Sequence, residues 1–129
     1  MSKGIARVTI VGNLTRDPDI RNVNADASSV CELGIAVNGS KKVQGQWEEY
    51  ASYFDVIVWG KQAESCAQYL TKGRQVAVDG RLEQQRWQDK ETGGNRSKVV
   101  VIADTVMFIG GEGKKRDDFN DIDFGDSLL

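Results

Sequence analysis

A chain of 129 residues, 40% hydrophobic and 28% charged, can form one compact core of ordinary size but not two. It has no histidine, and its two cysteines, Cys31 and Cys66, lack the spacing of a zinc site, so we expect reduced core cysteines, no metal and no cofactor. The net charge of -2 excludes a uniformly basic protein, although residues 1–113 hold equal numbers of acids and bases and could still carry a local basic groove. Residues 1–7 lack the apolar stretch of a signal peptide, and no apolar run approaches the roughly 20 residues of a transmembrane helix, so we expect a cytoplasmic protein.

Alternating small or apolar and polar residues predict three strands in the first half of the chain. The first covers residues 6–12 and is followed by a bend over 13–19, which holds the only proline. The second begins at residue 30 and runs to about 38 with one face exposed. Residues 39–49 follow neither periodicity and are expected to form an exposed hairpin loop, after which a third strand covers 51–59.

Apolar residues at helical spacing predict one amphipathic helix over residues 61–72, stopped by Gly73. A fourth strand over 76–87 follows, with a bulge or sharp bend at Gly80, and a glycine-rich turn leads to a fifth strand over 98–109. Five strands with one helix between the third and the fourth are typical of an OB-fold, a mostly β, five-stranded, partly open Greek-key barrel that binds oligonucleotides.

Four aromatic residues stand where a binding surface could use them. Tyr53 and Trp59 share one face of the third strand, roughly 20 Å apart, and Asp55 between them argues against a dry face. Trp47 and Trp87 lie in polar stretches, where an indole has little reason to be unless it meets a partner. Alternatively, these rings belong to the core, fold back over the barrel or lie in a subunit contact. Exposed rings with cations at the edges of the sheet suit single strands, whose bases expose faces for stacking.

Lysines and arginines in or beside the predicted hairpins and strands could follow phosphates, although a solvated surface is their alternative role. The candidates are Lys3, Arg7, Arg21, Lys41, Lys42, Lys61, Lys72, Arg74, Arg86 and Arg96, with Lys90 and Lys98 nearby. A nuclease would need clustered carboxylates and a general base, and the commonest base, histidine, is absent. The nearby acids, Asp17, Asp19 and Asp55, suit turn or surface roles better, so we expect no catalytic residue and no enzyme.

The composition changes after residue 111, which we take as the boundary between a folded domain, 1–111, and a disordered acidic tail, 112–129. Isolated large apolar residues within an acidic segment favour a short docking peptide for partner proteins, with a merely solubilising tail as the alternative. The docking candidates are Asp117, Asp118, Phe119, Asp121, Ile122, Asp123, Phe124, Leu128 and Leu129.

Three ordered motifs resemble those of bacterial-type single-stranded-DNA-binding proteins. Residues 11–21, VGNLTRDPDIR, are similar to the GNLxxDPExR opening of that family. Residues 59–82 resemble its (F/W)GKxAE...YLxKGxxVxVxGxL segment, and Trp87 matches a late tryptophan. The similarity runs from about residue 3 to 111.

This resemblance implies a homotetramer that binds and coats single-stranded DNA without sequence preference at the nucleoid or at replication sites, with Tyr53, Trp59 and Trp87 at stacking positions. Lys41 falls near a further stacking position, where Trp47 could substitute. The family's tail recruits replication, recombination and repair proteins through a Pro-Phe ending, whereas here the proline is absent and Phe124 is internal, as a phage or plasmid origin would explain. A related dimeric primosomal adaptor and an RNA-binding OB domain are the alternatives.

Overall fold

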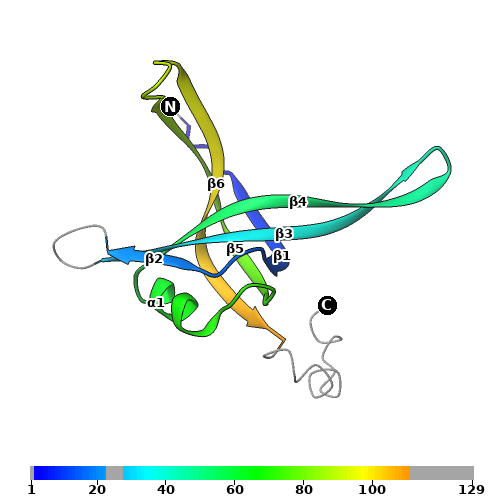
Figure 1. The fold of residues 1–129 in the computed structure, drawn as a ribbon, viewed down its shortest axis with the longest axis horizontal. Helices are drawn as coiled ribbons and strands as arrows, with labels where there is room; N and C mark the ends of the chain where they lie inside the picture. The colour runs from blue at the N-terminus through cyan, green and yellow to red at the C-terminus, as the bar shows by residue number, and fades with distance from the viewer. Residues whose placement is uncertain (1, 23–27, 111–129) are drawn as a thin grey trace.

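The computed structural model describes residues 2–22 and 28–110, which form one sheet and one helix. The elements are β1 (Arg7–Leu14), β2 (Asp19–Asn22), β3 (Ser29–Val43), β4 (Gln46–Trp59), α1 (Gly60–Tyr69), β5 (Gln75–Gln88) and β6 (Asn95–Ile109). Two long hairpins, β3–β4 and β5–β6, project from the body in different directions, and α1 lies at its base (Figure 1). The predicted acidic tail lies outside the described residues.

The sheet closes on itself as a barrel. Its strand order is β1-β5-β6-β4-β3-β2, and an additional pairing of β1 with β3 joins the two ends of the five-stranded ring. That closure consists of two residue pairs, Asn13 with Ala36 and Leu14 with Ile35. The parallel contact between β4 and β6 is equally short, pairing Val56 with Val101 and the residues that follow them. This mostly β barrel with one short helix is the predicted fold class.

The core consists of the inward-facing side chains of the strands together with one face of α1. Period-two burial is clear on β4, where Val56 and Val58 are fully buried between exposed or half-buried neighbours. Both cysteines are free and buried, as predicted. The fully buried side chains are Leu33, Ile35, Leu70, Val56, Val58, Val76, Val78, Val100, Val101, Cys31 and Cys66.

The predicted loop over residues 39–49 was wrong, because β3 and β4 continue through it as a two-stranded ribbon. The strands pair as far as Val43 with Gln46 and turn at Gln44 and Gly45, both of which have positive φ (52° and 83°). Two consecutive positive φ values give the tight hairpin turn whose twist matches that of the strands. Both faces of the ribbon are largely exposed, so its sequence shows no alternation.

Two further boundaries differ from the predictions, while the bulge is confirmed. The helix ends at Tyr69, because Leu70 adopts an extended backbone. Strand β2, which starts at the last residue of the bend predicted over 13–19 and was not itself predicted, is exposed along its length and pairs with β3. The pairing of β5 with β6 shifts between Asp79 and Gly80, where a Cβ atom on the glycine would overlap the carbonyl oxygen of Ile102.

Candidate nucleic-acid interface

The outward-facing side of β4 near the barrel carries Tyr53, Asp55, Ile57 and Trp59, and we call this set the β4 outer face. Its residues alternate with those that fill the core, so their side chains point away from the barrel. Tyr53 is 72% exposed and Trp59 is 47% exposed. The prediction that these two rings share an exposed face is confirmed, and their contact with DNA stays a prediction.

A cation from the turn after β1 lies against this face, and sequence reasoning missed it. Gly34 of β3 is the register partner of Asp55 on β4. A Cβ atom on Gly34 would overlap Nη1 of Arg16 and would lie 2.6 Å from Oγ1 of Thr15, so the Arg16 side chain covers the glycine. A glycine on the exposed side of a strand was the only sequence signal of this close approach.

The carboxylates on this side of the sheet are paired with cations. Nζ of Lys98, from β6, lies 3.3 Å from Oδ2 of Asp55. At the rim, Nη2 of Arg21 on β2 lies 3.3 Å from Oε2 of Glu32 on β3. Because Asp55 and Glu32 each have a cationic neighbour, this part of the surface does not present bare negative charge to a phosphate chain.

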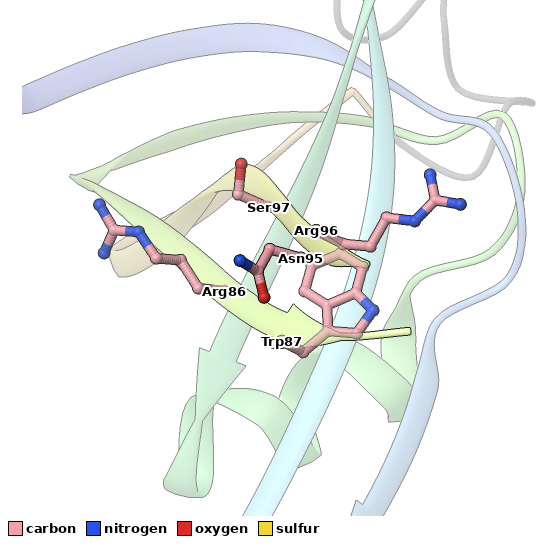
Figure 2. A pocket seen from close by; sticks show the side chains of 5 residues that line it. All are labelled: Arg86, Trp87, Asn95, Arg96 and Ser97. Carbon is pink, nitrogen blue, oxygen red and sulfur yellow. The ribbon is translucent and has the colours of Figure 1, made fainter. Parts of the chain in front are cut away.

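The β5–β6 hairpin carries a second aromatic position. Trp87 is 48% exposed and lies opposite Arg96 in the strand register, and both side chains extend to the same side of the hairpin (Figure 2). They border a shallow hollow of about 550 Å³, which is lined by Arg86, Trp87, Asn95, Arg96 and Ser97. Arg86 extends to the other side (Figure 2), so the indole face lies beside the guanidinium of Arg96, and together they can take a base with its phosphate.

Asp89 fixes the tip of this hairpin. Its Oδ1 accepts hydrogen bonds from the N–H groups of Glu91 and Thr92, and its Oδ2 lies 3.1 Å from Nη2 of Arg96. The N–H of Glu91, then that of Thr92 and finally the Arg96 guanidinium hold the pKa of Asp89 below its ordinary value. The carboxylate is therefore ionised at neutral pH and holds Arg96 beside Trp87.

The far end of the β3–β4 ribbon pairs lysines with aromatic rings. Nζ of Lys42 lies 5.9 Å from the ring centroid of Trp47, which is 70% exposed. Nζ of Lys41 lies 5.4 Å from the ring centroid of Tyr50. Such contacts favour one orientation of a flexible lysine, and this stabilisation is small because both groups are exposed to solvent. The structure thus places Trp47, Lys41 and Lys42 together, away from the β4 outer face.

Besides Arg21 and Arg96, whose ion pairs are described above, two more of the predicted phosphate contacts are engaged within the fold. Arg7 forms ion pairs with Asp79 at 2.9 Å and with Asp104 at 2.7 Å. Arg74 donates hydrogen bonds to the carbonyl oxygens of Tyr69 and Gly110, which ties the end of α1 to the end of β6. The remaining candidates are Lys3, Lys61 and Lys72, which are exposed and form no ion pair with another described residue.

The acids considered for a nuclease have other partners. Oδ1 of Asp17 accepts a hydrogen bond from the N–H of Lys72, and Asp19 lies 3.8 Å from Arg21. Within residues 2–22 and 28–110, no three cysteine or acidic side chains gather in a way that could hold a metal ion. In the same part of the chain no helix is long and apolar enough to cross a membrane. The predicted docking residues of the tail lie outside the described residues.

Comparison with known proteins extends these observations to most of the chain. A sequence model of the Single-strand binding protein family matches residues 5–109. The single-stranded DNA-binding protein of Treponema pallidum (strain Nichols) is 40% identical over 106 residues, which make up 82% of this chain and 58% of the relative. That of Borreliella burgdorferi is 39% identical over 108 residues, 83% of this chain and 72% of the relative.

Two solved structures resemble the barrel. One, of a Plasmodium falciparum SSB in complex with ssDNA, has a TM-score of 0.78 at 19% identity, covering 85% of this chain and 99% of the other. The second, a deletion mutant of the single-stranded DNA binding protein from Thermus aquaticus, has a TM-score of 0.75 at 32% identity, covering 88% and 54%. These likenesses confirm the predicted OB-fold.

The family match also bears on whether the chain is an enzyme. Members of the matched family are non-enzymatic DNA-binding proteins, which confirms the expectation that the chain is not an enzyme. The match spans nearly all of the described residues, including both projecting hairpins and α1. Together with the identity to the Borreliella relative, it shows that this chain belongs to the single-strand binding protein family.

Proposed function

We propose that this protein binds single-stranded DNA across the β4 outer face and the two projecting hairpins, and that it coats the strand largely by stacking and phosphate contacts. The observation that carries the proposal is the exposure of Tyr53 and Trp59 on one strand face with Arg16 and Lys98 beside them. Six residues of strand separate the two rings by about 20 Å, which suits two separate stacking positions rather than one.

Single strands fit this surface better than duplex does. Every unpaired base has a π-face that a ring can stack on, whereas the bases of a duplex are already stacked on one another. Proteins of this class gain about 1 to 3 kcal/mol per stacked base, and their cations track the phosphates without reading sequence. The names of the relatives, which state single-stranded DNA binding, support the same conclusion.

The test is fluorescence anisotropy of a labelled oligo(dT), competed with unlabelled single-stranded DNA, duplex DNA and RNA. We expect single-stranded DNA to displace the label at concentrations far below those of duplex, with affinity falling as salt rises. Equal competition by duplex would overturn the proposal. Preferred competition by RNA would support the RNA-binding alternative instead.

We infer that the protein assembles into a homotetramer, because the barrel leaves one strand edge and one sheet face uncovered. One edge of β1 pairs with β5 along residues 7–13, whereas the other edge pairs with β3 only at Asn13 and Leu14 and is open over residues 7–12 among the described residues. On the outer face of the sheet, Val11 and Met107 are both exposed and flank Ala77 in register. An open strand edge and an apolar stripe favour pairing with further copies. Light scattering of the native protein and of Val11→Glu tests this, with a monomeric native protein as the contradicting result.

We further propose that the acidic tail docks replication, recombination and repair proteins while the barrel holds DNA in the cytoplasm, at the nucleoid or at replication sites. The support is its composition, five acids and no base among residues 117–129 with Phe119, Ile122 and Phe124 between them. A chain ending at residue 111 should keep its affinity for oligo(dT) and lose binding to purified replication and repair proteins of the host. Unchanged protein binding would contradict a docking tail.

A further inference from the structure

The turn after β1 is tied to the barrel on both sides of Arg16. The N–H of Thr15 donates a hydrogen bond of 2.8 Å to the carbonyl oxygen of Gly34 on β3. The N–H of Lys72, in the loop after α1, donates one of 2.8 Å to Oδ1 of Asp17. Because the residues before and after Arg16 are each bonded to a different part of the barrel, the backbone that presents this arginine is held in place.

Gly34 allows the Arg16 side chain to lie on the surface of the sheet. Leu33 and Ile35 point into the core, so the position between them faces outward, yet Gly34 is buried. The cover comes from Arg16, since a Cβ atom on the glycine would overlap Nη1 of Arg16 and lie 3.1 Å from its Cζ. The guanidinium therefore rests against the backbone of β3, at a place where any other residue would displace it.

This position lies between the two proposed stacking rings. Gly34 is the register partner of Asp55, which is about 7 Å along β4 from Tyr53 and about 14 Å from Trp59. A DNA strand whose bases stack on both rings must carry its sugar-phosphate chain past this row. Arg16 lies over the neighbouring strand, about 5 Å to the side of β4, which is within the reach of an arginine side chain.

The local charges leave Arg16 available for a phosphate. Lys98 is paired with Asp55 and Arg21 with Glu32, each at 3.3 Å, so neither pair adds net charge to this side of the sheet. Arg16 is exposed and forms no ion pair with another described residue. We propose that the Arg16 guanidinium binds a phosphate of the DNA strand between the two stacking positions, and that it supplies the excess positive charge there.

The chemistry of this contact is independent of base sequence. A guanidinium presents several N–H donors in a planar fork that matches two phosphate oxygens. Because the turn and Gly34 already hold the group on the sheet, less conformational freedom is lost when DNA binds. A phosphate contact is the same for every nucleotide, so Arg16 should affect affinity and salt dependence without affecting base preference.

The inference rests on the proposed single-strand binding, and it is tested with Arg16→Gln, a change at an exposed residue that should leave the barrel folded. Anisotropy of labelled oligo(dT) over a range of salt should show affinity about 3- to 30-fold lower at low salt, and a slope of log affinity against log salt smaller by about 0.7. Arg16→Lys should restore the slope and part of the affinity, because it keeps the charge and loses the fork. Native affinity and slope in Arg16→Gln would overturn the inference. Failure of the native protein to bind oligo(dT) would instead overturn the proposed function.

A second variant tests the placement of the guanidinium separately from its charge. Gly34→Ala keeps every charge and displaces Arg16, so it should weaken binding in the native background and cause little further loss when combined with Arg16→Gln. Gly4→Ala is the matched control, because its added Cβ atom would meet nothing within 4 Å, and it should bind as the native protein does. Native affinity in a Gly34→Ala protein that is folded by circular dichroism, or an equal loss in both backgrounds, would contradict the placement of Arg16 by Gly34.

Discussion

Replacing Tyr53 with alanine separates the energy that the ring contributes to DNA binding from the energy that it contributes to folding. The side chain is 72% exposed, so roughly a quarter of its surface touches the protein. That contact is on the order of 50 Å² for a tyrosine and stabilises the fold by about 1 kcal/mol. A stacked base is worth about 1 to 3 kcal/mol, so the dissociation constant for a short oligo(dT) should rise about 5- to 150-fold.

The assay is fluorescence anisotropy with labelled oligo(dT), run beside thermal unfolding followed by circular dichroism. Tyr53→Phe is the matched control, because it keeps the ring and removes only the hydroxyl group, so its affinity should stay close to that of the native protein. The reasoning would be refuted if Tyr53→Ala bound DNA with native affinity. It would also be refuted if Tyr53→Phe lost as much affinity as Tyr53→Ala, since stacking would then not be the source.

Three other outcomes follow from the structure. Burial raises the pKa of the Cys66 thiol to about 12, and Cys31 is equally buried. Iodoacetamide should therefore modify neither cysteine in the native protein and both after denaturation. Rapid labelling of the native protein would contradict the placement of both cysteines in the core. The Thr9 hydroxyl and then Arg7 lower the pKa of Asp79, so the contribution of Asp79 to stability is present at neutral pH and is lost as the pH falls through 3.8 and below. In Asp79→Asn, the free energy of unfolding measured with urea should therefore depend less on pH in this range. Arg86→Gln should weaken DNA binding and reduce the slope of log affinity against log salt by about one, whereas an unchanged slope would exclude a phosphate contact there.

The barrel could be predicted because most of its strands bury one face. Burial on alternate residues is strong on β4, where Val56 and Val58 are fully buried, and the same parity placed Tyr53 and Trp59 together on the opposite face. The bulge at Gly80 was also readable, since a glycine within a strand often marks such a site.

The ribbon over residues 39–49 and strand β2 could not be predicted, because they bury neither face. Their hydrogen bonds form to a neighbouring strand, while their side chains remain largely in water, so no alternation in the sequence records them. The continuation of β3 and β4 depends instead on the turn at Gln44 and Gly45, whose positive φ values allow close pairing.

The polar part of the site depends on contacts between residues far apart in the chain. Lys98 reaches Asp55 because β6 runs parallel to β4, and Arg16 reaches Gly34 because the turn after β1 lies over β3. Composition marks each of these residues as charged or small, but it does not say which of them meet. The ion pairs of Arg7 with Asp79 and Asp104 were hidden from the sequence for the same reason.

The central claim, that the β4 outer face stacks on DNA bases, is tested most directly by a variant in which Trp59 is the only tryptophan. The protein has three tryptophans, and the other two, Trp47 and Trp87, are exposed on the hairpins, so replacing both with phenylalanine should leave the barrel folded. Titration of this variant with oligo(dT) should strongly quench its fluorescence, and duplex DNA should not. Binding of oligo(dT) without any change in the fluorescence of Trp59 would show that the strand passes elsewhere on the protein.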